Sequence, residues 1–128
     1  TIAAQAIPAG FVERLTEAPL VLVVLVDLSV VASFDSELDR VGVISGASVY
    51  PFVWNILLAA RNEGYGGTLT TFLAGEEPDA KALLGVPDDF AVCAMLPIGR
   101  PVKQLTRLKR KPVSAFATFD KLDGPPLE

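Results

Sequence analysis

The sequence contains no histidine, and Cys93 is its single cysteine among 128 residues. The absence of histidine excludes Ser-His-Asp and Cys-His catalysis within this chain, and it removes the commonest ligand of catalytic zinc. One cysteine cannot form an internal disulfide, which favours a reducing compartment. If the chain belongs to an enzyme, we therefore expect a bound cofactor to carry the chemistry and no metal site to contribute.

Charged residues are also scarce, at 20% of the chain against 51% hydrophobic residues. This composition predicts one folded domain over residues 1–128 rather than a disordered segment. The formal net charge of −4 argues against a general nucleic-acid binder. No basic start followed by an apolar run and a cleavage site is visible, so we expect a cytoplasmic protein.

Two apolar runs predict buried strands. The run 20–26 stops at Asp27, so it is too short for a membrane span, which needs about 20 apolar residues. Its valine content favours a strand covered on both faces, with Asp27 as a turn residue. The run 90–96 predicts a second buried strand that Pro97 ends, in which Cys93 is a small core residue rather than a nucleophile.

The segment from Val49 to Ala60 is apolar at almost every position, which predicts a helix buried on nearly every side. Pro51 leaves two starts open. The helix begins near Ser48 with Pro51 in its first turn, or a longer helix begins near Leu38 and bends at Pro51. Gly64 is placed to be a left-handed stop at its C-terminal end.

Shorter elements follow from local signals. Residues 11–16 predict one or two helical turns, and residues 76–85 predict a short helix with acids and proline at its front and glycine as its stop. Gly66 and Gly67 allow the backbone to approach a bulky neighbour closely. The basic segment 107–112 is either a solvated face or a local anion site.

Residues 46–71, Gly-Ala-Ser-Val-Tyr-Pro-Phe-Val-Trp-Asn-Ile-Leu-Leu-Ala-Ala-Arg-Asn-Glu-Gly-Tyr-Gly-Gly-Thr-Leu-Thr-Thr, closely resemble the central helix and flavin loop of the FMN-dependent nitroreductase family. Later landmarks are similar to that family in its order, at residues 83–89, 96–101, 110–113 and 119–120. The resemblance implies an α+β fold of the three-layer α/β type. It would have a central sheet with helices on both faces, and the apolar helix would lie buried at a homodimer interface.

The resemblance also implies a cofactor and a reaction. Family members bind FMN, take hydride from NADH or NADPH, and pass electrons to nitroaromatics, quinones or similar small-molecule acceptors. No side chain is assigned a catalytic role, because the flavin carries the chemistry. The positions that match the family's flavin contacts are Leu69, Thr70 and Thr71 beside the ring, and Arg110, with Lys109 as second choice, at the phosphate.

Residues 33–42 match a variable region that helps to cover the flavin pocket in the family, often for the partner subunit. Phe34 is therefore a substrate-pocket candidate. The alternative is a solvated loop or a helix start capped by Ser33 or Asp35.

Members of the resembled family open with a stretch rich in arginine and serine that clamps the FMN phosphate. We see no such stretch here, so we expect the C-terminal portion of a member. Three interpretations stay open: an FMN-dependent oxidoreductase represented by its C-terminal part, a flavin-binding relative without turnover, and a truncated form that acts as a structural dimerisation module.

Overall fold

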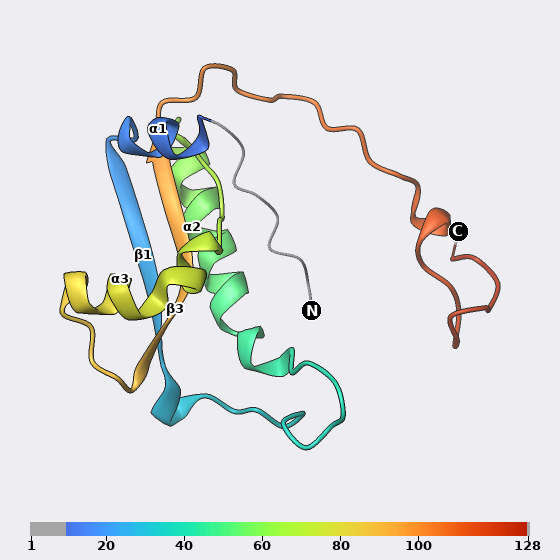
Figure 1. The fold of residues 1–128 in the computed structure, drawn as a ribbon. Coiled ribbons are helices and arrows are strands. Elements are labelled where there is room, and N and C mark those ends of the chain that lie inside the picture. The colour runs from blue at the N-terminus through green and yellow to red at the C-terminus, as the bar shows by residue number, and fades with distance from the viewer. Residues whose placement is uncertain (1–9, 128) are drawn as a thin grey trace.

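The computed structural model of this protein describes residues 10–127. Its elements are α1 (Phe11–Thr16), β1 (Leu20–Asp27), α2 (Val49–Asn62), β2 (Gly66–Gly67), α3 (Glu77–Leu84) and β3 (Phe90–Gly99). The strands form an antiparallel sheet in the order β1–β3–β2 (Figure 1). The predicted α+β class is confirmed. No helix among the described residues combines the length and apolar character needed to cross a bilayer.

The hydrophobic core lies between α2 and the sheet. Val24, Val53, Ala94, Leu96 and Ile98 form one buried cluster. Three of these belong to β3 at every second position, so one face of that strand packs against α2. In Figure 1, α2 lies behind the two long strands and α3 crosses in front of them, which agrees with the prediction of helices on both faces.

Two hydrogen bonds hold α3 against the start of β3. The Glu77 carboxylate accepts a hydrogen bond of 2.5 Å from the backbone N–H of Val92. The Lys81 ammonium group donates to the carbonyl oxygen of Phe90 at 2.7 Å. Gly85 follows the helix at a φ of 67°, which confirms it as the predicted left-handed stop.

The two strand predictions need correction at particular residues. In β1 only Val24 is buried, so the expectation of a strand covered on both faces is wrong for this chain. Among the described residues β1 is an edge strand that pairs only with β3, so it has a neighbouring strand on one side only. Asp27 ends β1 as a turn residue, as predicted, and its carboxylate accepts a 2.9 Å hydrogen bond from the N–H of Ser29.

β3 continues through Pro97 to Gly99, so the prediction that Pro97 ends the strand is wrong. Met95 and Thr70 exchange backbone hydrogen bonds of 2.8 and 3.0 Å. Backbone groups two residues apart in a strand point to the same side. The missing N–H of Pro97 therefore faces the short β2 side of the sheet, and the long ladder between β1 and β3 loses no bond.

The bounds of α2 settle the question that Pro51 left open. The helix begins at Val49, which places Pro51 in its first turn, where proline is tolerated. Gly64 follows its end at a φ of 84°, as predicted. The expectation that α2 is buried on nearly every side is wrong within this chain, because Val53 is its single buried residue. The side chain of Phe52 is 57% exposed.

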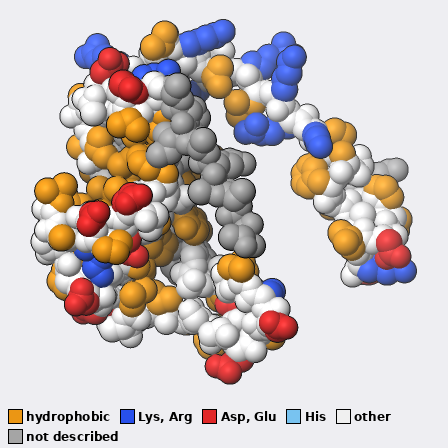
Figure 2. All heavy atoms as spheres, viewed as in Figure 1, with side chains coloured by type: hydrophobic (Ala, Val, Ile, Leu, Met, Phe, Trp, Pro, Cys, Tyr) orange, Lys and Arg blue, Asp and Glu red, His pale blue; other side chains and the backbone are white. Residues whose placement is uncertain are grey.

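Residues 101–127 form an arm that leaves the body after β3 and extends away from it (Figure 1). The near part of this arm is tied to α2 by the Arg61 guanidinium group, which donates to the carbonyl oxygen of Leu105. The far end folds on itself, since the N–H of Leu127 donates to the carbonyl of Ala117 at 2.9 Å. Figure 2 shows lysine and arginine side chains gathered where the arm leaves the body.

A close backbone approach at Gly67 generates a stability prediction. A Cβ atom at this position would lie 2.9 Å from Cδ2 of Leu57 and 3.1 Å from the carbonyl oxygen of Pro97. We expect Gly67→Ala to lower the free energy of unfolding by about 1–3 kcal/mol through overpacking. Chemical denaturation measures the change, and Gly75→Ala is the matched control because nothing lies within 4 Å of its Cβ position. Equal stability of the two variants would contradict the close approach.

Candidate functional site

The predicted flavin-contacting residues lie in a loop along one edge of the sheet, which we call the edge loop (residues 68–71). The N–H groups of Thr68 and Thr70 donate to the carbonyl oxygens of Pro97 and Met95 at 3.4 and 3.0 Å. Because successive N–H groups of an extended backbone point in opposite directions, those of Leu69 and Thr71 point away from β3. The sequence places this loop directly after β2, which aligns it with β3.

Neither of these two N–H groups has a hydrogen-bond partner among residues 10–127. An unpaired backbone donor at a sheet edge can bind water, another chain or a ligand. The side chain of Leu69 packs against the buried core cluster, so it fixes the position of the loop. The hydroxyl oxygen of Thr70 accepts a 3.4 Å hydrogen bond from the N–H of Phe72. The edge loop thus offers two outward-pointing donors on a well-supported backbone.

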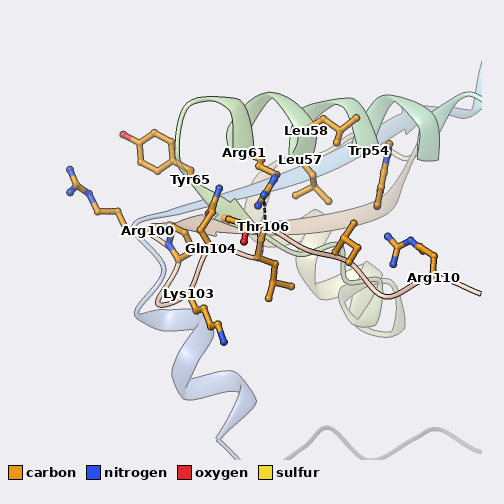
Figure 3. A pocket seen from close by; sticks show the side chains of 16 residues that line it. Trp54, Leu57, Leu58, Arg61, Tyr65, Arg100, Lys103, Gln104, Thr106 and Arg110 are labelled. Atoms are coloured by element: carbon orange, nitrogen blue, oxygen red, sulfur yellow. Dashed lines mark hydrogen bonds between the residues drawn. The ribbon is translucent and has the colours of Figure 1, made fainter.

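A groove of about 730 Å³ lies between α2 and the first part of the arm (Figure 3). We call it the basic groove, because four of its lining residues carry positive charge. Its apolar wall includes Trp54, Leu57 and Leu58, which project from α2. Its cationic residues are Arg61, Arg100, Lys103 and Arg110.

The charge of the basic groove is unbalanced. Among the described residues that line it, none is acidic, although the chain as a whole has a net charge of −4. The cations come from the end of α2, the end of β3 and the arm, so folding brings together charges that are far apart in the sequence. Figure 3 shows the Arg100 and Lys103 side chains pointing away from Arg110, so the four groups make the groove electropositive without converging on one point. An electropositive groove attracts a phosphate or another anion.

A second cavity of about 590 Å³ lies at the other end of the edge loop. Thr71 and Cys93 line it, together with part of the segment that precedes α2, residues 42–46. Most of its lining is apolar. The remaining lining residues are Val26, Leu28, Val31, Val49, Tyr50, Ala74, Ala91 and Val92.

Cys93 is the extra residue of a β-bulge, because Val24 pairs with Ala94 whereas Leu25 pairs with Val92. Its side chain is half-buried in the second cavity. Burial raises the pKa of the thiol above its ordinary value, and the nearby Glu77 carboxylate raises it further. A raised pKa leaves little thiolate at neutral pH, which agrees with the reading of Cys93 as a packing residue.

The structure does not bring all of the predicted site residues together in one cavity. Arg110 lines the basic groove, and Lys109 lies outside it. Thr71 lines the second cavity. The side chain of Phe34 is 88% exposed and lines neither cavity, so its assignment to a substrate pocket stays a prediction.

Three cations of the basic groove were missed by sequence reasoning. Arg61 ends an apolar helix, and Arg100 and Lys103 stand singly around a proline. No local pattern in the sequence links them to Arg110. In the structure Gly66 comes close to Pro101, since a Cβ at Gly66 would lie 3.0 Å from the Pro101 Cβ, and this approach brings the two segments together.

Solved structures of three proteins are similar to this chain. A BluB-like flavoprotein from Clostridium difficile 630 is 26% identical with a TM-score of 0.50, over 61% of this chain and 38% of that chain. A nitroreductase-like protein from Streptococcus mutans is 24% identical with a TM-score of 0.48, over 59% of this chain and 36% of that one. Nitroreductase A from Vibrio parahaemolyticus shares the fold at 18% identity and a TM-score of 0.53, over 94% of this chain and 71% of that chain.

The sequence model of the nitroreductase family matches residues 3–100. The chain belongs to the nitroreductase family. The match includes the edge loop and ends at Arg100, so Lys109 and Arg110 lie beyond it. The chain spans 38% and 36% of the lengths of the first two solved structures. No relative among curated protein sequences matches it.

The environment of Cys93 predicts slow alkylation. We expect iodoacetamide to modify the folded protein several-fold more slowly than the denatured protein at the same mildly alkaline pH, because the raised pKa reduces the thiolate fraction. The difference should shrink as the pH rises through the pKa of the folded-state thiol. Mass spectrometry of timed samples measures both rates. Equal rates in the two states would contradict the packing role.

Proposed function

We propose that this chain is part of an FMN-dependent oxidoreductase that takes hydride from NADH or NADPH and reduces a small acceptor such as a nitroaromatic or a quinone. The observation that supports the proposal is the pair of outward-pointing N–H groups at Leu69 and Thr71. They lie on a loop that resembles the family's flavin loop and falls within the residues matched by the family model. When bound, FMN would accept the hydride and pass its electrons on. The chain needs no histidine for this chemistry.

The role of the edge loop is to hold and tune the flavin ring. Its backbone donors are suited to the ring's nitrogen and oxygen acceptors, and they carry no charge that titrates with pH. Because Thr68 and Thr70 are anchored to β3, the donors at Leu69 and Thr71 are oriented before a ligand arrives. Preorganised donors of this kind lose little conformational entropy on binding.

The role of the basic groove is to hold the FMN phosphate. Arg110 is the primary partner in this proposal, and Arg61, Arg100 and Lys103 add positive charge around it. The Arg61 guanidinium group also bonds the carbonyl of Leu105, so it links α2 to the arm that carries Arg110. Figure 3 labels Arg61, Arg100, Lys103 and Arg110 and shows the near part of the arm.

We infer that the protein acts as a homodimer. The supporting observation is that α2 exposes large apolar side chains within this chain, among them Phe52, which lines neither cavity, and Tyr50, Trp54 and Leu58. An apolar surface of this kind favours a protein interface over water. The single cysteine supports a cytoplasmic location, and the net negative charge argues against a nucleic-acid partner.

The phosphate assignment is tested by Arg110→Ala. We expect the Kd for FMN to rise roughly tenfold to a hundredfold, because a charge-assisted bond to phosphate contributes about 1.5–3 kcal/mol. Fluorescence titration of the full gene product with FMN measures this change. Arg107→Ala is the matched control, since it removes the same charge from the same segment but lies outside the groove. An unchanged Kd for Arg110→Ala would exclude Arg110 as the phosphate partner.

The homodimer is tested by Phe52→Glu. A carboxylate on the outer side of α2 would lose its hydration on association, so we expect the monomer fraction to increase strongly. Sedimentation velocity at several protein concentrations measures the distribution. Leu83→Glu is the control, because Leu83 is exposed on α3. A dimer that tolerates Phe52→Glu as well as Leu83→Glu would show that α2 is not the interface.

A further inference from the structure

Among residues 10–127, Asp35 is the one charged residue that is buried, with 5% of its surface exposed. Its carboxylate accepts hydrogen bonds from the Arg40 guanidinium group at 2.7 Å, from the N–H of Val43 at 2.8 Å, and from the N–H of Ile44 at 3.4 Å. Arg40 also donates to the carbonyl oxygen of Val41 at 2.9 Å. One carboxylate therefore organises the whole turn between residues 35 and 44.

Hydrogen bonds rather than apolar packing hold this turn. Val41, Val43 and Ile44 are all exposed, so the hydrophobic effect contributes little to their position. The N–H of Val43 and then the Arg40 guanidinium group keep the pKa of Asp35 below its ordinary value, so the carboxylate is charged at neutral pH. Removal of the carboxylate would leave two backbone donors and one arginine without their shared acceptor.

The turn anchored by Asp35 forms part of the wall of the second cavity. Gly42, Val43, Ser45 and Gly46 line this cavity, and so does Thr71 of the edge loop. Gly46 packs closely on the Tyr50 ring, since a Cβ at this position would lie 2.6 Å from its Cε2 atom. The position of residues 42–46 therefore controls how much space remains beside Thr71.

We propose that Asp35 is a positioning residue that fixes the wall at residues 42–46 and so limits the size of the acceptor that reaches the edge loop. The inference rests on the proposed flavin-dependent function and adds a specificity determinant to it. In this proposal Asp35 acts through the backbone of Val43 and Ile44, to which its carboxylate is hydrogen-bonded, and not by touching the electron-accepting substrate. The cavity of about 590 Å³ has the volume of an ordinary small-molecule site.

The first test compares two acceptors of different size. Asp35→Asn and Asp35→Ala are assayed in the full gene product with 1,4-benzoquinone and the bulkier 1,4-naphthoquinone. A loosened wall is expected to raise the ratio of kcat/KM for the bulky over the small quinone by about tenfold, with the larger effect in Asp35→Ala. The Kd for FMN should stay within about twofold of wild type, because Asp35 is not among the residues that line the basic groove. Asp39→Asn is the matched control, since it makes the same chemical change at an exposed position of the same turn.

The second test needs no flavin turnover. Hydrogen exchange at the amides of Val43 and Ile44 should become at least about tenfold faster in Asp35→Ala, because their acceptor is lost. Arg40→Gln keeps that acceptor and should show a smaller change in the same direction, which covers the case in which Asp35→Ala fails to fold. Faster exchange with unchanged quinone selectivity would overturn the inference and leave the proposed function intact. Absence of FMN binding and quinone reduction by the wild-type protein would overturn the proposed function itself.

Discussion

Val53 of α2 and Leu96 of β3 are fully buried in one cluster, and the rest of the structure depends on this contact between helix and sheet. Leu57 and Ala60, further along α2, pack against the same cluster, so the reversal at Gly64 delivers the chain to β2 and then to the edge loop. Thr70 of the edge loop pairs with Met95, one residue before Leu96, and this pairing sets the position of the loop along β3. A displacement of the helix along β3 would therefore change the direction in which Leu69 and Thr71 present their N–H groups.

The same packing leaves a large part of the apolar surface uncovered. One side of α2 and much of β1 remain exposed, although both segments are among the most hydrophobic in the sequence. Large exposed apolar patches favour contact with another protein surface. In the proposed homodimer, the exposed side of α2 is covered by a second copy. The basic groove next to that side is then close to the subunit boundary, which suits a cofactor held at the rim of an interface.

Sequence patterns predicted the helices and strands well, because they depend on local periodicity and on glycine. Gly64 and Gly85 ended their helices as expected. The error at Pro97 arose because a proline in a strand is judged by which side its missing N–H faces, and only the register with Thr70 reveals that side. Burial was overestimated for α2 because an all-round apolar pattern does not say which chain supplies the cover.

The candidate site was less predictable than the fold. Leu69, Thr70 and Thr71 were predicted through resemblance, and in the structure their backbone N–H groups alternate in direction. The basic groove combines charges from three segments, which no local motif could bring together. Asp35 looked like one of several polar residues in a solvated loop or a possible helix cap. Its burial follows from the fold of residues 35–44, which the sequence pattern did not specify.

The central claim is that this chain contributes the edge loop and the basic groove to an FMN site. An absorbance spectrum of the purified full gene product, recorded before and after NADH or NADPH is added without oxygen, tests it most directly. We expect visible flavin bands that bleach with the nicotinamide and return when a quinone is added. A protein that stays colourless after incubation with excess FMN and removal of the unbound cofactor would contradict it.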